Sequence, residues 1–320
     1  MKFLIIRFSS IGDIVLTTPV IRCLKTQFKN AEVHYLSKTA FSSVLKDNPY
    51  IDKLYLIDSK VAEVSGSLKQ EKYDVVIDLH HNFRSLQVKN AIKTKSFSFQ
   101  KLNYKKWLLV NLKVNRLPAV HIVDRYLETI KSFGIVNDGK GLDFFLSEED
   151  EINLSDLPLH FQNGYLALVL GGTYYTKQIP MNKLSEICER SRLPLVLLGG
   201  KQEMRTADNL SQKYGDKVFN ACGKFSLKQS AFLIKHALKV FTSDTGLMHI
   251  AAAFKKDIVS IWGNTIPEFG MSPYLPGENS IMLENKSLGC RPCSKLGYSK
   301  CPKSHFRCMK ELSIPEHIFN

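Results

Sequence analysis

The stretch VFTSDTGLMHIAAA, residues 240–253, decides the fold of this chain. It predicts a short apolar strand that ends at Phe241, then a polar turn, and then a helix that runs into three consecutive alanines. The first turn of a helix has free N–H groups, and the helix dipole places positive charge there. The stretch therefore predicts a site for a phosphate or diphosphate where the strand ends.

Side chains in the same stretch suit that ligand. Ser243 and Thr245 offer hydroxyl donors, and Gly246 lets the backbone approach closely. His249 lies one turn into the helix, on the same face as Thr245. A structural alternative stays open, in which a Ser or Asp cap precedes a buried, alanine-rich helix.

Length and composition bound the class of protein. The chain has 320 residues, 44% hydrophobic and 23% charged, which predicts a globular protein with two domains of roughly 150 residues each. No apolar run approaches the roughly 18 to 20 residues that span a bilayer, so we expect a cytoplasmic protein. A net charge of +14 predicts an anionic partner, which is nucleic acid, a phosphorylated ligand or an anionic membrane face.

The N-terminal stretch predicts the first half of a βαβ unit. Residues 3–6 are an apolar strand, SSIGD forms a turn, and residues 14–24 are an apolar helix with a kink or a short first turn at Pro19. Asp13 lies at the carboxyl end of the strand, where open α/β sheets bind ligands, so it is a candidate general base and a candidate helix cap. Gly12 stands alone, which argues against a dinucleotide-binding fingerprint.

Further strands are predicted at residues 32–36, 53–57 and 73–79, at the spacing of alternating strands and helices. A polar cluster, DLHHNFRS, follows the last of them. Adjacent histidines such as His80 and His81 rarely ligate one metal ion, and no Cys or carboxylate is spaced to complete the set. We therefore interpret this cluster as a ligand-contacting loop.

The segment between Leu79 and Val123 contains no acidic residue. Its basic residues are Arg84, Lys89, Lys93, Lys95, Lys101, Lys105, Lys106, Lys113 and Arg116. Tyr104 and Trp107 lie among them, so the segment predicts contact with a phosphorylated amphiphile or a membrane surface. A solvated basic face is the alternative.

A helix over residues 121–133 ends at Gly134 and closes the first half. The acidic run at residues 148–151 and Pro158 then interrupt the periodicity, and we expect the domain boundary there. The predicted parts are an N-terminal acceptor-binding domain of residues 1–155, a linker of residues 156–163, and a C-terminal nucleotide-sugar-binding domain of residues 164–320.

The second half repeats the alternation, with strands predicted at residues 165–170, 195–198 and 258–262. Two glycines and Thr173 follow the first of these strands, and Lys177 comes shortly after them. Small residues with free N–H groups and a lysine can hold phosphate oxygens without a metal. Glu203 follows the next strand. At that position its carboxylate is expected either to accept a hydrogen bond from a ribose or to cap the next helix.

Together these motifs resemble glycosyltransferase family 9, the bacterial heptosyltransferases of lipopolysaccharide core assembly. The resemblance rests on SSIGD after the first strand, on Lys177 with Pro180, and on DTG at residues 244–246 with His249 and the alanines. It covers the chain from residue 1 to about residue 310. It implies an α/β fold of GT-B architecture, in which two Rossmann-like domains with parallel sheets face a central cleft.

The resemblance also implies roles for individual residues. Asp13 would be the catalytic base that takes a proton from the acceptor hydroxyl. The donor diphosphate, the shape of its site and the nucleoside would depend on Thr173, Lys177, Glu203, Asp244, Thr245, Gly246 and His249. The acceptor would meet Ser10, Gly12, Arg84, Lys105 and Lys106.

The implied reaction is an inverting, metal-independent transfer of heptose from ADP-heptose to a lipopolysaccharide inner-core acceptor. We expect a cytoplasmic enzyme, peripheral to the inner membrane, with no cofactor required for catalysis. The family often has Trp between the lysine and the proline where this chain has Gln178 and Ile179, so another nucleotide sugar is an alternative. A basic nucleic-acid-binding protein is an alternative of another class, but no recognition helix or RNP-type pattern supports it, and we expect no nucleic-acid partner.

The seven cysteines fall into two groups. Three have ordinary helix or core positions, namely Cys23, Cys188 and Cys222. Four share one Gly-, Pro- and Lys-rich segment that opens with a C-x-x-C pair, namely Cys290, Cys293, Cys301 and Cys308. The grouping predicts either a structural zinc site or free, redox-sensitive thiols.

Overall fold

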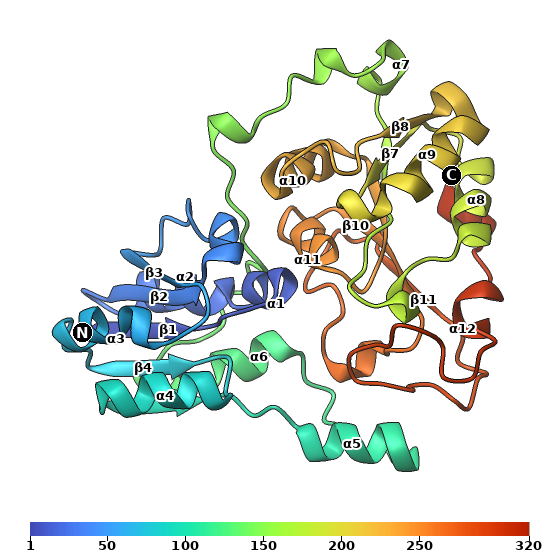
Figure 1. Ribbon diagram of the computed structural model, residues 1–320. Helices are drawn as coiled ribbons and strands as arrows, with labels where there is room; N and C mark the ends of the chain where they lie inside the picture. The colour runs from blue at the N-terminus through green and yellow to red at the C-terminus, as the bar shows by residue number, and fades with distance from the viewer. Residues whose placement is uncertain (320) are drawn as a thin grey trace. The chain divides into compact units, whose positions relative to one another are not determined.

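The computed structural model describes residues 1–319 and divides the chain into two compact units (Figure 1). Unit 1 contains Met1–Lys101 and Val120–Phe145. Unit 2 contains Leu102–Ala119 and the chain from Leu146 onward. The chain therefore enters unit 2 for one short excursion, returns to unit 1, and then enters unit 2 for the remainder of its length.

Unit 1 is built on a parallel sheet with the strand order β3-β2-β1-β4-β5. Its strands are β1 (Lys2–Ile6), β2 (Glu32–Lys38), β3 (Lys53–Ile57), β4 (Val75–Asp78) and β5 (Lys95–Ser98). The first four lie where the sequence predicts strands. No apolar pattern in the sequence predicts β5, because its side chains are mostly polar and none of them is buried.

The helices of unit 1 correct two predictions. They are α1 (Ile11–Val15), α2 (Thr18–Gln27), α3 (Ala62–Gln70), α4 (Phe83–Ile92) and α6 (Ile122–Leu127). The helix predicted at residues 14–24 is divided in two, because α1 ends at Val15 and α2 begins at Thr18. Pro19 lies in the first turn of α2, where the missing N–H of proline costs nothing, and the break agrees with the kink or short first turn predicted there. The helix predicted at residues 121–133 ends six residues early, and a separate 3₁₀ turn, Lys131–Phe133, leads to Gly134 in the left-handed conformation.

Unit 2 is built on a second parallel sheet with the order β11-β10-β9-β6-β7-β8. Its strands are β6 (Leu166–Val169), β7 (Leu195–Leu198), β8 (Val218–Asn220), β9 (Lys239–Ser243), β10 (Asp257–Trp262) and β11 (Ile281–Glu284). Its helices are α5 (Asn103–Leu112), α7 (Leu159–Gln162), α8 (Met181–Arg190), α9 (Met204–Tyr214), α10 (Leu227–His236), α11 (Gly246–Ala253) and α12 (Arg307–Lys310). The expected strand, polar turn and helix of residues 240–253 are β9, its turn and α11.

Apolar strands carry the core of each unit. In unit 1 one cluster joins Leu4, Ile6, Leu36 and Val76, and in unit 2 another joins Leu168, Leu197, Phe241 and Val259. Parallel strands covered by helices are buried on both faces, which explains their continuous apolar runs. Burying each such side chain contributes about 1.5–3 kcal/mol, so the cores fix the strand ends from which the polar loops emerge.

In each sheet, the chain first adds strands on one side of the first strand and then crosses to its other side. In unit 1 the chain adds β2 and β3 on one side of β1 and then places β4 on the other side. In unit 2 it adds β7 and β8 on one side of β6 and then places β9 on the other side. Open α/β sheets bind ligands beyond the carboxyl ends of the strands at such a switch point.

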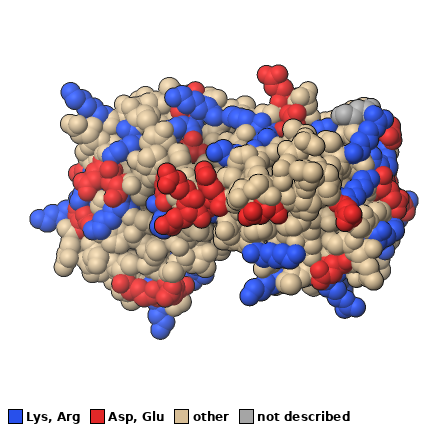
Figure 2. Space-filling view, turned by 90° about the horizontal axis from the view of Figure 1, so that it is seen from above, with Lys and Arg blue, Asp and Glu red and all other residues tan. Residues whose placement is uncertain are grey.

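No helix within residues 1–319 combines the length and the apolar character that crossing a membrane requires. Basic and acidic side chains are interspersed on the face shown in Figure 2. The excess of positive charge therefore does not form one continuous patch on that face.

Candidate active site

The loop after β1 holds Asp13 from two sides. Ser10 precedes α1 and donates to Asp13 Oδ2 through its backbone N–H at 3.2 Å and through its hydroxyl at 2.8 Å. The other oxygen, Oδ1, lies 2.7 Å from Nη2 of Arg7. Asp13 thus caps its helix, as one interpretation predicts, and it also forms an ion pair.

Arg7 is an almost buried charge at the switch point of unit 1. Its Nε donates to the Ser9 carbonyl at 2.7 Å, and its Nη1 donates to the Leu79 carbonyl at 2.6 Å and to the Tyr126 hydroxyl at 3.1 Å. Its side chain is 10% exposed, whereas that of Asp13 is 21% exposed. The guanidinium therefore fixes the orientation of a carboxylate that remains accessible, which is what a general base requires.

The two histidines after β4, His80 and His81, have different surroundings. Burial, together with the charges of Arg7 and Lys101, lowers the pKa of His80 to about 4, so its ring is neutral near pH 7. The His80 ring packs edge-on against Phe8. His81 instead places Nδ1 3.0 Å from the Phe99 carbonyl. The two rings therefore have different partners, Phe8 for His80 and the Phe99 carbonyl for His81.

A pocket of about 620 Å³ opens beside Arg84 in unit 1. Its lining comes from the loop after β3, from α3 and from the start of α4, and includes Lys60, Asn82, Phe83 and Arg84. The Arg84 guanidinium also lies 5.5 Å from the Phe8 ring, next to His80. Two cationic groups at one pocket favour an anionic ligand.

The residues predicted to meet the acceptor are distributed over both units. Ser10, Gly12 and Arg84 belong to unit 1, and Gly12 is buried inside α1. Lys105 and Lys106 lie on α5 and belong to unit 2. Lys105 is exposed, whereas the Lys106 ammonium lies over the Phe269 ring at 5.6 Å.

In unit 2 the loops after β6 and β9 meet through an ion pair. Lys177 Nζ lies 2.6 Å from Asp244 Oδ2, and the two side chains are 18% and 12% exposed. Thr265, after β10, donates its hydroxyl to the same carboxylate oxygen at 3.0 Å. Asp244 therefore positions the lysine ammonium at the switch point of this sheet.

Thr245 begins α11. Its Oγ1 accepts from the Met248 N–H at 3.3 Å and lies 3.1 Å from the Thr242 hydroxyl. Gly246 is the first helical residue, and His249 is buried one turn further on. The capping interpretation is confirmed in kind, although the cap is Thr245 and neither a serine nor an aspartate. Because α11 begins three residues after the end of β9, its first turn lies at the carboxyl end of that strand.

Thr173 and Glu203 complete the set of predicted donor residues. Thr173 is exposed in the loop after β6. Glu203 ends the 3₁₀ turn Lys201–Glu203 and accepts from the Gly200 N–H through Oε2 at 2.8 Å, which is the capping alternative. A side chain added at Gly171 would begin 3.7 Å from this carboxylate, so Glu203 lies directly against the glycine turn.

The sequence profile of glycosyltransferase family 9 (heptosyltransferase) matches residues 61–300, most of the chain. This chain belongs to that family. It is 27% identical to a lipooligosaccharide heptosyltransferase 2 from Campylobacter jejuni, an alignment that covers 99% of this chain and 96% of the relative.

Solved structures support the same fold. A family 9 glycosyltransferase from Veillonella parvula superposes with a TM-score of 0.71 at 22% identity, covering 89% of this chain and 86% of that one. The E. coli heptosyltransferase WaaC, solved with ADP-2-deoxy-2-fluoro heptose, gives 0.66 at 20% identity, covering 88% and 92%. The chain is thus a family 9 glycosyltransferase of GT-B architecture, and the alternative of a nucleic-acid-binding protein loses its support.

Arg291 organises the loop after β10, a role that no motif in the sequence predicts. It is buried and donates to the carbonyls of Gly263 at 2.5 Å, Thr265 at 3.0 Å and Asn285 at 2.8 Å. Glu284 balances its charge at 3.1 Å. Since Thr265 in turn holds Asp244, the Cys-rich segment supports the Lys177–Asp244 pair. In the sequence, the only signal for Arg291 is its position inside the C-x-x-C motif of Cys290 and Cys293.

Two buried polar side chains at this edge suit a ligand. Across residues 1–319, the Ser243 hydroxyl and both polar atoms of the Asn264 side chain have no hydrogen-bond partner. Both residues are 1% exposed and follow or end neighbouring strands. An unpaired buried polar group is costly unless water or a ligand satisfies it, so a polar ligand is expected nearby.

The predicted zinc site is not assembled. In the part of the chain that the structure describes, one group of three candidate ligands has its atoms within 4.8 Å of one another, and it is Glu32, His34 and Glu71. The four clustered cysteines are free and do not form such a group. Burial raises the pKa of Cys293, and its neighbours Cys290 and Cys301 raise it further, so these three thiols lie in one region.

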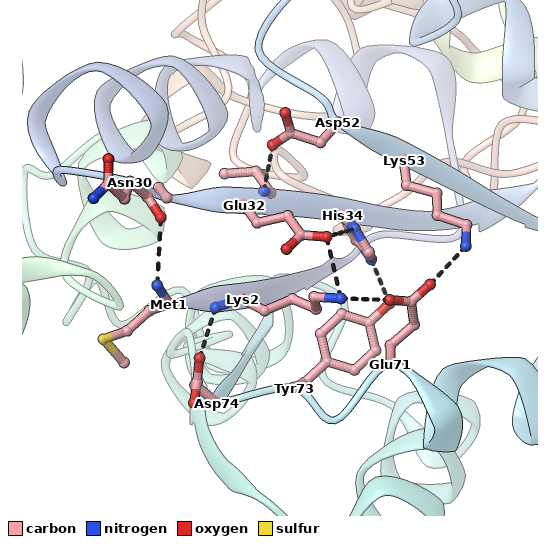
Figure 3. A network of polar contacts seen from close by, with 12 residues as sticks. Met1, Lys2, Asn30, Glu32, His34, Asp52, Lys53, Glu71, Tyr73 and Asp74 are labelled. Carbon is pink, nitrogen blue, oxygen red and sulfur yellow. Dashed lines mark hydrogen bonds and ion pairs between the residues drawn. The ribbon is translucent and has the colours of Figure 1, made fainter.

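The Glu32, His34 and Glu71 group is itself a satisfied polar network (Figure 3). Lys2 lies 3.1 Å from Glu32 and 2.6 Å from Glu71, and Lys53 lies 2.6 Å from the other Glu71 oxygen. Two ammonium groups already neutralise the two carboxylates. The network therefore ties the amino ends of β1, β2 and β3 together and does not need a metal.

Proposed function

We propose that this family 9 glycosyltransferase moves a heptose from ADP-heptose to a lipopolysaccharide inner-core acceptor, with inversion and without a metal. The observation that carries the proposal is the ion pair of Lys177 and Asp244 beside the start of α11. A lysine ammonium and the free N–H groups of a helix together provide positive charge for a diphosphate. The relative WaaC, solved with an ADP-heptose analogue, supports the choice of donor.

Each donor residue has a part in this proposal. Lys177, Thr173 and the N-terminal turn of α11 would bind the diphosphate oxygens, and Asp244 and His249 would hold those groups in place. Glu203, against the glycine turn after β6, would hydrogen-bond the ribose through the carboxylate oxygen that does not cap its turn.

The chemistry would be one displacement. Asp13 takes the proton of the acceptor hydroxyl, the freed oxygen forms a bond to the anomeric carbon of heptose, and the bond from that carbon to the diphosphate breaks. The departing ADP keeps the electron pair, and Lys177 stabilises its added negative charge. Attack opposite to the leaving group inverts the anomeric centre. Because the lysine and the helix supply the charge, the step needs no metal ion.

The acceptor would meet a basic surface. Ser10 and Gly12 border the base, and Arg84 with Lys60 lines the pocket of unit 1, where an acceptor phosphate or acidic sugar fits. Lys105 and Lys106 would contribute further cationic contacts. An acceptor attached to lipid places the enzyme at the cytoplasmic surface of the inner membrane.

A different nucleotide sugar is the second candidate, favoured by one departure from the family. Gln178 and Ile179 stand between the lysine and the proline, where the family often has Trp, and the Ile179 side chain is buried in the core of unit 2. Gln178 donates to the Gly172 carbonyl at 2.9 Å, so it is engaged within the glycine turn. A pocket of about 530 Å³ lined by both residues lies next to this turn.

Calorimetric titration with ADP, UDP, GDP and CDP, with and without EDTA, tests the donor. Selective binding of ADP that EDTA leaves unchanged is expected, followed by ADP release when ADP-heptose and an acceptor are supplied together. Preference for another nucleotide would transfer the proposal to the second candidate. Loss of turnover on adding EDTA would refute metal independence.

A further inference from the structure

Helix α5 has one packed face and one exposed face. On the packed face, Leu109 is 7% exposed and forms a cluster with Ile266 and Phe269 of unit 2. Lys113, just beyond the helix, donates to the carbonyls of Cys290 at 3.1 Å and Pro292 at 2.7 Å. The helix is therefore fixed to the body of unit 2 and is not a loose appendage.

The exposed face of α5 is apolar and aromatic. Tyr104, Trp107 and Leu112 are 72%, 52% and 58% exposed. The helical spacing places Tyr104 and Trp107 on the side away from Leu109, whereas Leu112, three residues after Leu109, lies at the edge of the packed face where the helix ends. Val114, just after the helix, is 41% exposed. A cluster of large apolar side chains on one exposed face of a protein is typical of an interaction surface.

The charge around this face has one sign. Residues 79–123 contain no Asp or Glu, and within unit 2 this acid-free segment supplies Lys105, Lys113 and Arg116. A second acid-free segment, residues 285–310, adjoins α5 through the Lys113 contacts. That segment exposes further basic and apolar side chains, namely Lys295, Leu296, Tyr298 and Lys300.

We propose that α5 docks this enzyme onto an anionic lipid bilayer, with Tyr104, Trp107 and Leu112 entering the headgroup region and the surrounding lysines facing lipid phosphates. Tyr and Trp favour this interface because their rings are apolar at one end and polar at the other. Lys and Arg beside it are attracted by the negative surface potential of anionic lipids. The biological use of this surface rests on the proposed function, whose acceptor is attached to lipid.

Other occupants fit the surface less well. A second copy of α5 would bring the same basic side chains together without an acidic partner. A small soluble anion would account for the lysines but leave the exposed tryptophan without a role. A bilayer satisfies the apolar face and the positive charge at the same time.

The chain carries its own reporter for this docking. It has two tryptophans, of which Trp262 is 1% exposed and Trp107 is 52% exposed. A change in emission on adding vesicles therefore reports mainly on Trp107. Vesicles of phosphatidylcholine with about one quarter phosphatidylglycerol should shift the emission to the blue, and brominated acyl chains should quench it, whereas phosphatidylcholine alone should do neither.

Charge and apolar variants with matched controls locate the surface. Lys105→Glu should weaken sedimentation with the anionic vesicles about tenfold, whereas Lys235→Glu, the same charge change at an exposed residue of α10, should leave it unchanged. Leu112→Ser should weaken it about threefold. Leu159→Ser, at a residue 78% exposed on α7, is its control.

Three results would overturn the docking proposal. They are equal binding of the two charge variants, a Trp107 emission that vesicles leave unmoved, and displacement of the vesicles by delipidated core oligosaccharide. Heptose transfer to that water-soluble acceptor is measured in parallel. Transfer without vesicle binding would refute the docking surface alone, and vesicle binding without transfer would refute the proposed function alone.

Discussion

Asp13→Asn separates the proposed chemistry from the structural role of the same side chain. The substitution keeps the shape of Asp13 and removes its ability to accept a proton. A positioned general base contributes about 10²- to 10⁴-fold, so we expect kcat to fall by that factor. The affinity for ADP should stay unchanged, because the proposed diphosphate contacts, Lys177 and the start of α11, all belong to unit 2.

The same substitution has a stability cost that follows from its contacts. Breaking a buried ion pair costs about 3–5 kcal/mol because one charge is left unpaired. Arg7 keeps its three other acceptors, and the amide oxygen of the variant side chain can still accept from it, so about 2–3 kcal/mol is the appropriate range. At about 3–4 °C per kcal/mol for a unit of this size, the unfolding midpoint of unit 1 should fall by about 6–12 °C.

Asp138→Asn is the matched control, since it also weakens a buried pair in unit 1. Arg22 Nε lies 2.8 Å from Asp138, and the two side chains are 4% and 15% exposed. Both variants are assayed for ADP release at a temperature where each is fully folded, together with thermal unfolding. If the two variants kept equal turnover, Asp13 would have no role as a base and the proposed mechanism would fail.

Three other substitutions test the remaining parts of the site and fold. Lys177→Met should lower kcat about 10²- to 10³-fold and weaken ADP binding in calorimetry, because it removes the only side-chain cation assigned to the departing diphosphate. Arg291→Lys should weaken ADP binding about tenfold and lower the unfolding midpoint, because one ammonium cannot replace the guanidinium's directed donors. Glu71→Gln should destabilise the protein by about 1–3 kcal/mol near neutral pH in urea unfolding. Hydrogen bonds from Lys2 and Lys53 hold the pKa of Glu71 far below its usual range, so this difference should be complete above a pH of about 4 and disappear as the pH falls further.

Each of these has a result that would contradict it. Lys201→Met, an exposed lysine in a neighbouring loop of unit 2, should not reproduce the loss seen with Lys177→Met. Unaltered ADP affinity in Arg291→Lys would show that the loop after β10 keeps its shape without the guanidinium. A difference between wild type and Glu71→Gln that did not shrink at all as the pH was lowered step by step below about 4 would show that the ionised carboxylate is not its cause.

The strands and the loops at their carboxyl ends were accessible from the sequence for a physical reason. A parallel strand buried on both faces must be apolar along its length, so a run such as Leu195–Leu198 is visible without any partner. The ends of parallel strands meet at one edge of the sheet, so Asp13 and Asp244 could be placed at ligand-binding edges. Their roles came only from the resemblance to a family.

Elements that depend on distant partners were not accessible. β5 is polar because it lies at the edge of its sheet, where pairing with β4 decides its conformation. Nothing local shows that α5, preceded and followed in the chain by unit 1, packs on Ile266 and Phe269 of unit 2. The predicted basic segment at residues 84–116 is therefore divided between the two units.

Two arginines show most clearly what sequence patterns omit. Arg7 and Arg291 count toward a net charge of +14, from which the sequence predicts anionic partners at the surface, yet both are nearly buried. Each donates mainly to backbone carbonyls, and a carbonyl has no residue identity that a pattern can detect. Each nevertheless bears on a proposed functional group, Arg7 directly on Asp13 and Arg291 through Thr265 on Asp244. The fold thus uses buried arginines to orient acidic groups at both switch points, and only the exposed lysines and arginines remain available to attract an anionic acceptor or a membrane.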